Sequence, residues 1–328
     1  MKLREELLMN RRQIILSGTM ATLIPATLAA QKPPAGEPGD EVVELWPGGA
    51  PGGDRVTVQE EIIERLPHGL LRDRFAQHVT VPSLTLFNPK VAYNGITLLI
   101  VPGGGYVRVV IDKEGVEAAE WFTERGFAAA VLRYRLPADG WTNGADAPVH
   151  DAMRAMRLLR AHPRKGVSSS RVGIIGFSAG GHLSGRLITE PNLTYAKRDD
   201  ADDLLARPDF AVLMYPVIAT SGQHAHSGSA QQLLNSGVRG SDLHRYAPNL
   251  NVGPQTPPTM LVHAADDTSV PVENSLLMYD ALRKASVRSE LHVFDSGGHG
   301  FGLRGVAGKD VAAWPTLVQN WATNNATP

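Results

Sequence analysis

The pentapeptide GFSAG at residues 176–180 contains the side chain best placed for covalent chemistry, the hydroxyl of Ser178. The apolar run 171–175 before it is typical of a buried strand, and 181–187 can begin a helix. A serine on a sharp strand-to-helix turn exposes its Oγ, and the flanking glycines are needed where a Cβ would collide with neighbouring backbone. Chance alone predicts about 0.2 such pentapeptides in a chain of this composition. The neighbouring segments and possible partner residues must therefore show whether this pentapeptide is functional. The alternative is an inert serine in a glycine-rich turn.

The C-terminal third of the chain supplies an acid and a histidine, each after a predicted strand. The run 259–263 precedes a loop that contains Asp266 and Asp267, while 289–294 precedes a loop that contains His299. Because the carboxyl ends of parallel strands meet at one edge of a sheet, these side chains can reach Ser178. Ser178 would then attack an ester carbonyl, His299 would accept its proton, and the acid would orient the histidine.

A run of three glycines, 103–105, follows the apolar run 96–101 and precedes Tyr106. Acyl-transfer enzymes stabilise the oxyanion with backbone N–H groups aimed at the developing charge. We expect Gly104 and Gly105 to supply such groups together with Ala179, the residue after the nucleophile. A phosphate-binding loop is disfavoured, because no Lys-Ser/Thr pair follows the glycines and the G-x-G-x-x-G spacing is absent.

These segments together resemble the secreted esterases of the acetyl xylan esterase and feruloyl esterase group, which are related to hormone-sensitive-lipase-like carboxylesterases. Further matching segments, in order between residues 45 and 301, are LWPGGAPG at 45–52, KEG at 113–115, VLRYR at 131–135, DAMRAMR at 151–157 and GHGF at 298–301. The resemblance implies an α/β-hydrolase fold with a mostly parallel, doubly wound sheet, helices on both faces and a small cap insertion. The region at about 186–257 matches no motif and is expected to form this cap and to select the substrate.

The same resemblance implies a serine esterase that hydrolyses short-chain acyl esters, acetyl esters first, on xylan-type or other plant carbohydrate. Its partner would be a small-molecule, oligosaccharide or polysaccharide ester, and neither a cofactor nor a metal is expected. A feruloyl or general short-chain carboxylesterase is the nearest alternative.

Other classes of protein fit the sequence less well. A serine peptidase usually carries an extra recognition domain, for which we expect no room. A lipase would need an apolar lid, whereas 219–257 is polar. A non-catalytic binding protein on this scaffold would be expected to lose the serine, the acid or the histidine, and all three are present here.

The acid is expected to be Asp267 and not Asp266. The D-x-x-V-P spacing from Asp267 to Val270 and Pro271 is the one that the resemblance places at the catalytic acid. Pro271 also fits the first turn of a helix. Asp266 is then expected to form a turn.

Other polar and aromatic residues receive weaker assignments. Tyr106, Tyr215, Trp141 and Arg304 are expected to line the acyl or sugar pocket. His182 is expected to be packed in a helix, and three further histidines, His224, His226 and His244, are expected at the surface. Arg154, Arg157 and Arg160 recur at three-residue spacing, and we interpret them as a solvated helix face.

The alternation of strand and helix patterns predicts a parallel sheet covered by helices. Predicted strands include an edge strand at 79–87 and buried strands at 127–134 and 210–216. Predicted helices cover 112–125, 148–162, 272–285 and 311–323.

Composition is compatible with one globular enzyme domain. The 32 basic and 33 acidic side chains nearly cancel, so no net field favours nucleic acid or an anionic membrane. A hydrophobic content of 43% over 328 residues can fill one large core. The absence of cysteine excludes disulfides and cysteine-ligated zinc.

The N-terminal segment indicates export. Arg11 and Arg12 precede an apolar stretch that ends near Leu28 and is followed by Ala29 and Ala30. This pattern predicts a twin-arginine-like signal peptide over 1–30, with Sec export or an uncleaved anchor as alternatives. The prediction is a linker over 31–44, a catalytic domain over 45–328, and a periplasmic or extracellular protein that leaves the membrane after cleavage.

Overall fold

The computed structural model describes residues 30–31, 38–161, 167 and 171–325. Residues 1–29, which carry the predicted signal peptide, lie outside the described residues. Within the described part, no helix combines the length and the apolar character that crossing a bilayer requires.

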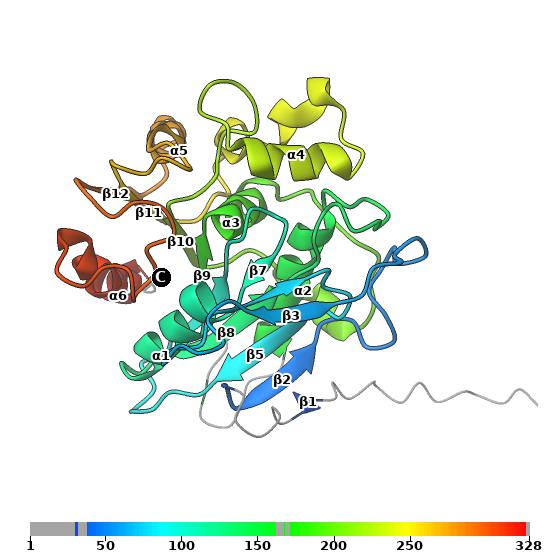
Figure 1. The fold of residues 1–328 in the computed structure, drawn as a ribbon, viewed down its shortest axis with the longest axis horizontal. Coiled ribbons are helices and arrows are strands. Elements are labelled where there is room, and N and C mark those ends of the chain that lie inside the picture. Colours follow the sequence, from blue (N-terminus) through cyan, green and yellow to red (C-terminus); the bar gives the residue numbers. More distant parts are fainter. Residues whose placement is uncertain (1–29, 32–37, 162–166, 168–170, 326–328) are drawn as a thin grey trace, which may run out of the picture.

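A nine-stranded sheet forms the centre of the molecule (Figure 1). Its strands, in spatial order, are β1 (Ala30–Gln31), β2 (Glu41–Glu44), β5 (Ser83–Phe87), β8 (Ala128–Arg133), β6 (Thr97–Val101), β9 (Val172–Phe177), β10 (Phe210–Met214), β11 (Thr259–Ala264) and β12 (Ser289–Phe294). Pairing is parallel from β8 to β12 and antiparallel among β1, β2, β5 and β8. The predicted mostly parallel sheet is confirmed.

The central strands are buried along their whole length, and their sequences explain this. The runs at β6, β9, β10 and β11 are almost entirely apolar, with Thr97, Thr259 and His263 as the polar exceptions, and every residue in them is buried. A parallel strand with helices on both faces has no solvated side and therefore needs no polar alternation.

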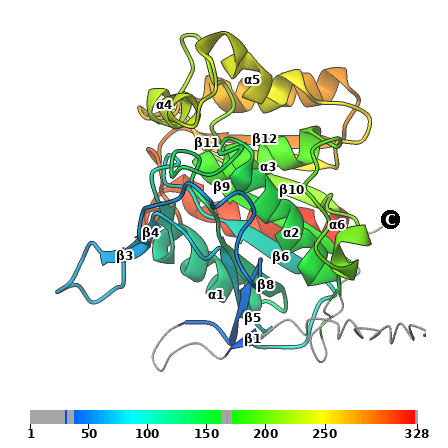
Figure 2. The same ribbon diagram turned by 90° about the vertical axis from the view of Figure 1, so that its right-hand side faces the viewer.

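Of the six α-helices in the described residues, all but α4 cover the two faces of this sheet (Figure 2). Leu183, Met156 and Met278, from α3, α2 and α5, share one apolar layer, while Phe122 and Trp314, from α1 and α6, belong to the other. The helices are α1 (Glu117–Thr123), α2 (Ala147–Ala161), α3 (Ala179–Thr189), α4 (Ser227–Asn235), α5 (Glu273–Lys284) and α6 (Trp314–Asn325). A π-helical turn, η1 (Asp112–Val116), precedes α1, and 3₁₀ turns lie at η2 (Asp200–Asp203), η3 (Gly240–Tyr246), η4 (Pro248–Leu250) and η5 (Asp310–Ala313).

The predicted edge strand and linker are both wrong in part. β5 lies between β2 and β8 inside the sheet, because Glu41–Glu44 adds a further strand to it. Val43 on β2 is 5% exposed and packs in the core. Two apolar residues within a stretch rich in proline and glycine were too weak a signal to predict a strand.

The region predicted as one cap insertion is divided by the sheet. β10 occupies 210–214 within it and pairs with β9 and β11. The remainder contains η2 on one side of β10, and α4, η3 and η4 on the other. Figure 1 shows α4 lying beyond α3, at the same end of the molecule as α5.

The arginines of α2 are not a solvated face, contrary to our interpretation. Arg154 is 1% exposed and forms ion pairs with Asp199 and Asp202. Arg160 pairs with Asp209 at 3.0 Å. The three-residue spacing does keep the arginines on one side of the helix. Residues 199–209 cover that side, and their carboxylates pair with the arginines.

A second, three-stranded sheet was not predicted. It consists of β3 (Glu61–Glu64), β4 (Arg74–Gln77) and β7 (Val109–Val110), paired antiparallel. Because only residues 106–108 separate β7 from the glycine run 103–105, this sheet holds the loop that faces Ser178.

Candidate active site

Ser178 lies on a strained turn between β9 and α3. Its φ of 53° is in the left-handed region, which non-glycine residues rarely adopt. Its N–H donates to the Met214 carbonyl at 3.0 Å, and its own carbonyl accepts from the His182 and Val217 N–H groups at 3.1 Å. A Cβ at Gly176 would collide with the Gly180 carbonyl, so the first glycine of the pentapeptide is required by contact. A Cβ at Gly180 would likewise collide with the Val101 carbonyl.

The three predicted catalytic side chains form one hydrogen-bonded chain. The Oγ of Ser178 lies 2.9 Å from Nε2 of His299. The Nδ1 of His299 lies 2.6 Å from Oδ2 of Asp267. Ser178 is 5% exposed and Asp267 is 7% exposed, so the first and the last residue of this hydrogen-bonded series are shielded from solvent.

Asp267 is held as an ionised acceptor. Its Oδ1 accepts from the N–H groups of Ser269 and Val270 at 2.9 Å. Burial raises the pKa of Asp267, but hydrogen bonds from His263 and His299 outweigh burial and bring the net pKa below its ordinary range. A carboxylate in this state can orient His299 and stabilise its positive charge.

Asp266 contacts the histidine loop from a different side. Its Oδ1 accepts from the N–H groups of Gly297 and Gly298 at 2.8 and 2.7 Å. It therefore restrains the segment immediately before His299, which is more than the local turn that we expected of it.

The glycine loop packs directly on the serine. A Cβ at Gly103 would lie 2.8 Å from the Cβ of Ser178. Gly104, Gly105 and Tyr106 follow with φ values of 132°, 65° and 64°. No hydrogen bond engages the N–H of Gly104 or Gly105 in the part of the chain that the structure describes. Ala179 is the first residue of α3, where an N–H has no acceptor within the helix.

Two residues without a predicted catalytic role join the loops of this site. Glu114, which is 4% exposed, accepts from the Gly103 N–H through Oε2 at 2.8 Å and from the Tyr215 hydroxyl through Oε1 at 2.9 Å. The Tyr215 ring packs edge-on against His299, with ring centroids 5.1 Å apart. Glu114 lay within a segment that carried the resemblance, but nothing local indicated its contacts.

A cleft of about 370 Å³ opens beside Ser178 and His299. Gly104, Gly105, Glu114, His226 and Ser269 contribute to its wall. His226 was expected at the surface, but it is half-buried, because the turn before α4 brings it to the cleft. Burial lowers the pKa of His226, and the nearby His299 lowers it further.

The predicted substrate-binding residues lie elsewhere. Tyr106 is 2% exposed, and its hydroxyl is 2.7 Å from Nδ1 of the buried His182, which packs in α3 as expected. Tyr215 is fully buried, with its hydroxyl on Glu114. Trp141 packs under Arg135, and Arg304 is bound to Glu117 and Asp73. None of the four lines the cleft beside Ser178, because tertiary contacts use their polar atoms or rings.

Among the described residues, no group of histidine and carboxylate side chains is arranged to hold a metal ion.

The fold and the strained serine define an α/β-hydrolase. Residues 117–325 match the prolyl oligopeptidase family, Peptidase_S9, and the chain belongs to this family. The resemblance to acetyl xylan esterases is also confirmed by the relatives.

The chain is 34% identical over 254 residues to the acetylxylan esterase of Xylanibacter ruminicola, covering 76% of this chain and 48% of that protein. It is 34% identical over 204 residues to endo-1,4-beta-xylanase B of Butyrivibrio fibrisolvens, covering 62% of this chain and 32% of that protein. The chain thus spans half or less of the length of these two relatives. Among solved structures, the acetyl ester-xyloside bifunctional hydrolase of Caldicellulosiruptor lactoaceticus matches with a TM-score of 0.69 at 33% identity, covering 88% of this chain and 97% of that one.

Proposed function

We propose that this α/β-hydrolase is a serine carboxylic ester hydrolase that removes short acyl groups, acetyl above all, from xylan-type or related carbohydrate. The observation that carries the proposal is the hydrogen-bonded chain from Asp267 through His299 to Ser178, which ends at the cleft beside the glycine loop. The acetylxylan esterase and the acetyl ester-xyloside hydrolase among the relatives support the substrate class.

In the proposed reaction, Ser178 Oγ attacks the ester carbonyl while its proton passes to Nε2 of His299. The tetrahedral oxyanion accepts hydrogen bonds from the N–H of Ala179 and from the N–H groups of Gly104 and Gly105. His299 then donates its proton to the departing alcohol, which leaves an acyl group on Ser178. Water attacks this acyl-enzyme by the same steps, with His299 as base, and the acid is released.

A comparison of wild type with Ser178→Ala tests the nucleophile. The variant removes one hydroxyl, so we expect loss of acetate release from acetylated xylan with an unchanged circular dichroism spectrum. Substantial turnover by the folded variant would refute the assignment. Equal inactivity of both proteins on every ester would favour a non-catalytic binding protein instead.

A release assay with defined esters tests the acyl group. The small cleft beside Ser178 predicts that acetyl esters are cleaved much faster than esters of ten carbons or more. Faster release of ferulate would favour a feruloyl esterase, and faster cleavage of long chains a lipase. The matching family is named after prolyl oligopeptidase, so a prolyl peptide amide belongs in the same panel. Preferential cleavage of that amide would overturn the ester proposal.

Export is a separate part of the proposal and is supported by the paired Arg11 and Arg12 before an apolar stretch. N-terminal sequencing of the exported protein should begin near Gln31. A protein that still starts at Met1 or Met9 would contradict export with cleavage. Replacing both arginines with lysine distinguishes the twin-arginine route from Sec, because only the former should be blocked.

A further inference from the structure

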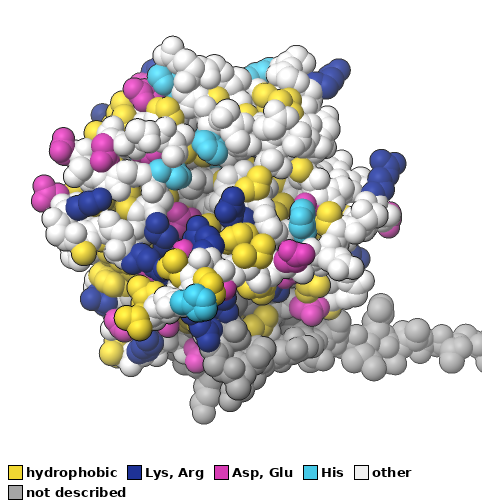
Figure 3. All heavy atoms as spheres, in the orientation of Figure 1, with side chains coloured by type: hydrophobic (Ala, Val, Ile, Leu, Met, Phe, Trp, Pro, Cys, Tyr) yellow, Lys and Arg dark blue, Asp and Glu magenta, His cyan; other side chains and the backbone are white. Residues whose placement is uncertain are grey.

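Arg65, Arg108 and Lys113 line the cleft that contains Ser178 and His299. Arg65 follows β3, Arg108 precedes β7, and Lys113 lies in η1, so the basic side chains converge from different elements. Figure 3, which has the orientation of Figure 1, shows Lys and Arg side chains gathered near the middle of the face that it presents. The convergence places positive charge beside the proposed nucleophile.

Phe75 on β4 supports both arginines without neutralising them. The guanidinium carbon of Arg108 lies 4.8 Å from the centre of the Phe75 ring, and that of Arg65 lies 5.8 Å from it. Phe75 itself is 6% exposed and is therefore fixed in place. A cation held by an aromatic face keeps its full charge and its hydrogen-bond donors.

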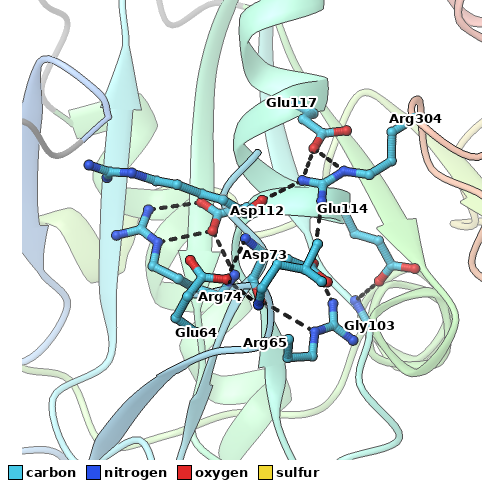
Figure 4. A network of polar contacts seen from close by, with 11 residues as sticks. Glu64, Arg65, Asp73, Arg74, Gly103, Asp112, Glu114, Glu117 and Arg304 are labelled. Atoms are coloured by element: carbon cyan, nitrogen blue, oxygen red, sulfur yellow. Dashed lines mark hydrogen bonds and ion pairs between the residues drawn. The ribbon is translucent and has the colours of Figure 1, made fainter. Parts of the chain in front are cut away.

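The carboxylates near the cleft are already used by other groups (Figure 4). Asp112 accepts from the N–H and the guanidinium of Arg74, and Glu117 accepts from Arg304. Asp73 lies 2.6 Å from Arg65. These pairs account for Asp112 of η1, Glu117 of α1 and Asp73 of the β3–β4 connection.

Glu114 is the acidic side chain in the wall of the cleft, and it is also engaged. Both of its oxygens accept hydrogen bonds, from the Gly103 N–H and from the Tyr215 hydroxyl. By contrast, no carboxylate pairs with Arg108 or Lys113 anywhere in the described ranges. The donors to Glu114 are neutral, so its negative charge offsets part of the charge of Arg108 and Lys113, and the wall of the cleft has a net positive charge.

We propose that this cleft binds an ester that carries a carboxylate, with Arg108 and Lys113 as the partners of that carboxylate and Arg65 as a weaker, shared contact. The proposal rests on the proposed ester hydrolase function and narrows its substrate class. A carboxylate is the fitting ligand because guanidinium and ammonium groups both donate charge-assisted hydrogen bonds to it. The carboxylate can belong to the alcohol part, as in an acetylated uronic acid sugar, or to the acyl part, as in the half-ester of a dicarboxylic acid.

Two matched substrate pairs distinguish these sources. For the alcohol part, the pair is an acetylated methyl glucuronoside and the corresponding acetylated methyl glucoside. For the acyl part, the pair is monomethyl succinate and methyl butyrate. The readout is the ratio of kcat/KM for the anionic ester to kcat/KM for its neutral partner, measured by acid release at constant pH.

In wild type we expect this ratio to exceed one for at least one pair and to fall as salt is added, because partly exposed charges are screened. Arg108→Gln and Lys113→Gln should each lower the ratio by about threefold to tenfold, and Arg108→Lys should retain most of it. Lys284→Gln is the matched control, because Lys284 lies on α5 with a side chain that is 75% exposed. That control should leave the ratio unchanged.

Ratios that stay the same in Arg108→Gln, Lys113→Gln and the double variant would overturn the proposal, while turnover of the neutral esters would leave the ester hydrolase function intact. If no ester is cleaved, the proposed function fails separately. Calorimetry on Ser178→Ala then tests the carboxylate site alone, with glucuronate against glucose and succinate against butanol. Tighter binding of the carboxylates that is lost in Arg108→Gln supports the site, and equal binding refutes it.

Discussion

At the residue scale, Asp266 and Asp267 hold adjacent parts of one loop but contact different atoms. Asp267 accepts from the imidazole of His299, whereas Asp266 accepts from the backbone of Gly297 and Gly298. Their variants should therefore separate chemistry from loop stability.

Asp267→Asn should lower kcat by about 10⁴ with little change in KM. The amide favours the wrong histidine tautomer, which reduces stabilisation of the transition state but does not affect binding of the substrate in the ground state. Asp266→Asn should cost activity mildly and lower the thermal midpoint. Steady-state kinetics with a short acyl ester measure both effects. An inactive Asp266→Asn protein beside an active Asp267→Asn protein would reverse the assignment.

His182 is a second residue whose environment gives a measurable prediction. Burial lowers its pKa from 6.5 to about 3, and the nearby Arg186 charge acts in the same direction. Between these values the unfolded chain binds a proton that the folded protein excludes, so stability falls as the pH decreases from about 6.5 toward 3.

We expect this one group to contribute about 1.4 kcal/mol per pH unit in that range. Urea unfolding of wild type and His182→Gln at pH 7, 6 and 5 should therefore give free energies of unfolding that converge as the pH falls. His244→Gln, at an exposed position, is the control and should run parallel to wild type. Parallel curves for His182→Gln would contradict the prediction.

At the scale of elements, the site depends on residues that leave neighbouring strands at one edge. Tyr215 directly follows β10, has a φ of 35°, and links Glu114 of η1 to the loop after β12. Its buried hydroxyl donates to Glu114, and burial followed by that carboxylate raises the pKa of the phenol well above its ordinary value. The glycine loop and the histidine loop therefore share one support.

Tyr215→Phe should keep the ring against His299 but leave Glu114 without one of its donors. We expect kcat to fall by about tenfold, with a smaller change in KM, because the support acts on the geometry of the reaction. Kinetics and a thermal melt on the same preparation separate the two roles. An unchanged kcat with a lowered melting temperature would show that the hydroxyl serves stability alone.

At the scale of the whole molecule, Arg154 connects distant parts of the chain. It lies on α2, donates to the Leu45 carbonyl at 3.1 Å, and pairs with Asp202, whose side chain is 2% exposed. Removing one partner of a buried ion pair leaves the other charge uncompensated.

Arg154→Ala should lower the free energy of unfolding by about 3–5 kcal/mol, as measured by urea denaturation. Arg239→Ala, where the side chain is 80% exposed, should change it by less than about 0.5 kcal/mol. A similar small effect for Arg154→Ala would mean that residues 199–209 are not anchored through this side chain.

The sequence alone could predict some features of this protein and not others, and the burial of Arg154 is one that it could not. Features that local backbone chemistry requires were predictable: the glycines around Ser178, the buried apolar strands, and the order of Asp267 and His299 after successive strands. Features that depend on contacts between distant segments were not predictable, such as the extra strand β2, the sheet of β3, β4 and β7, and the burial of Arg154.

By itself, then, the sequence determined the class of fold and the residues able to form a Ser–His–Asp chain, because steric limits and strand periodicity act within a few residues. Only the tertiary structure decided which side chains line the cleft. Tyr106 and Tyr215 look like pocket residues by type and position, but His182 and Glu114 engage their hydroxyls inside the protein. Nothing in the local sequence around Arg108 and Lys113 indicates that they line the cleft, and they do so because separate elements converge beside Ser178.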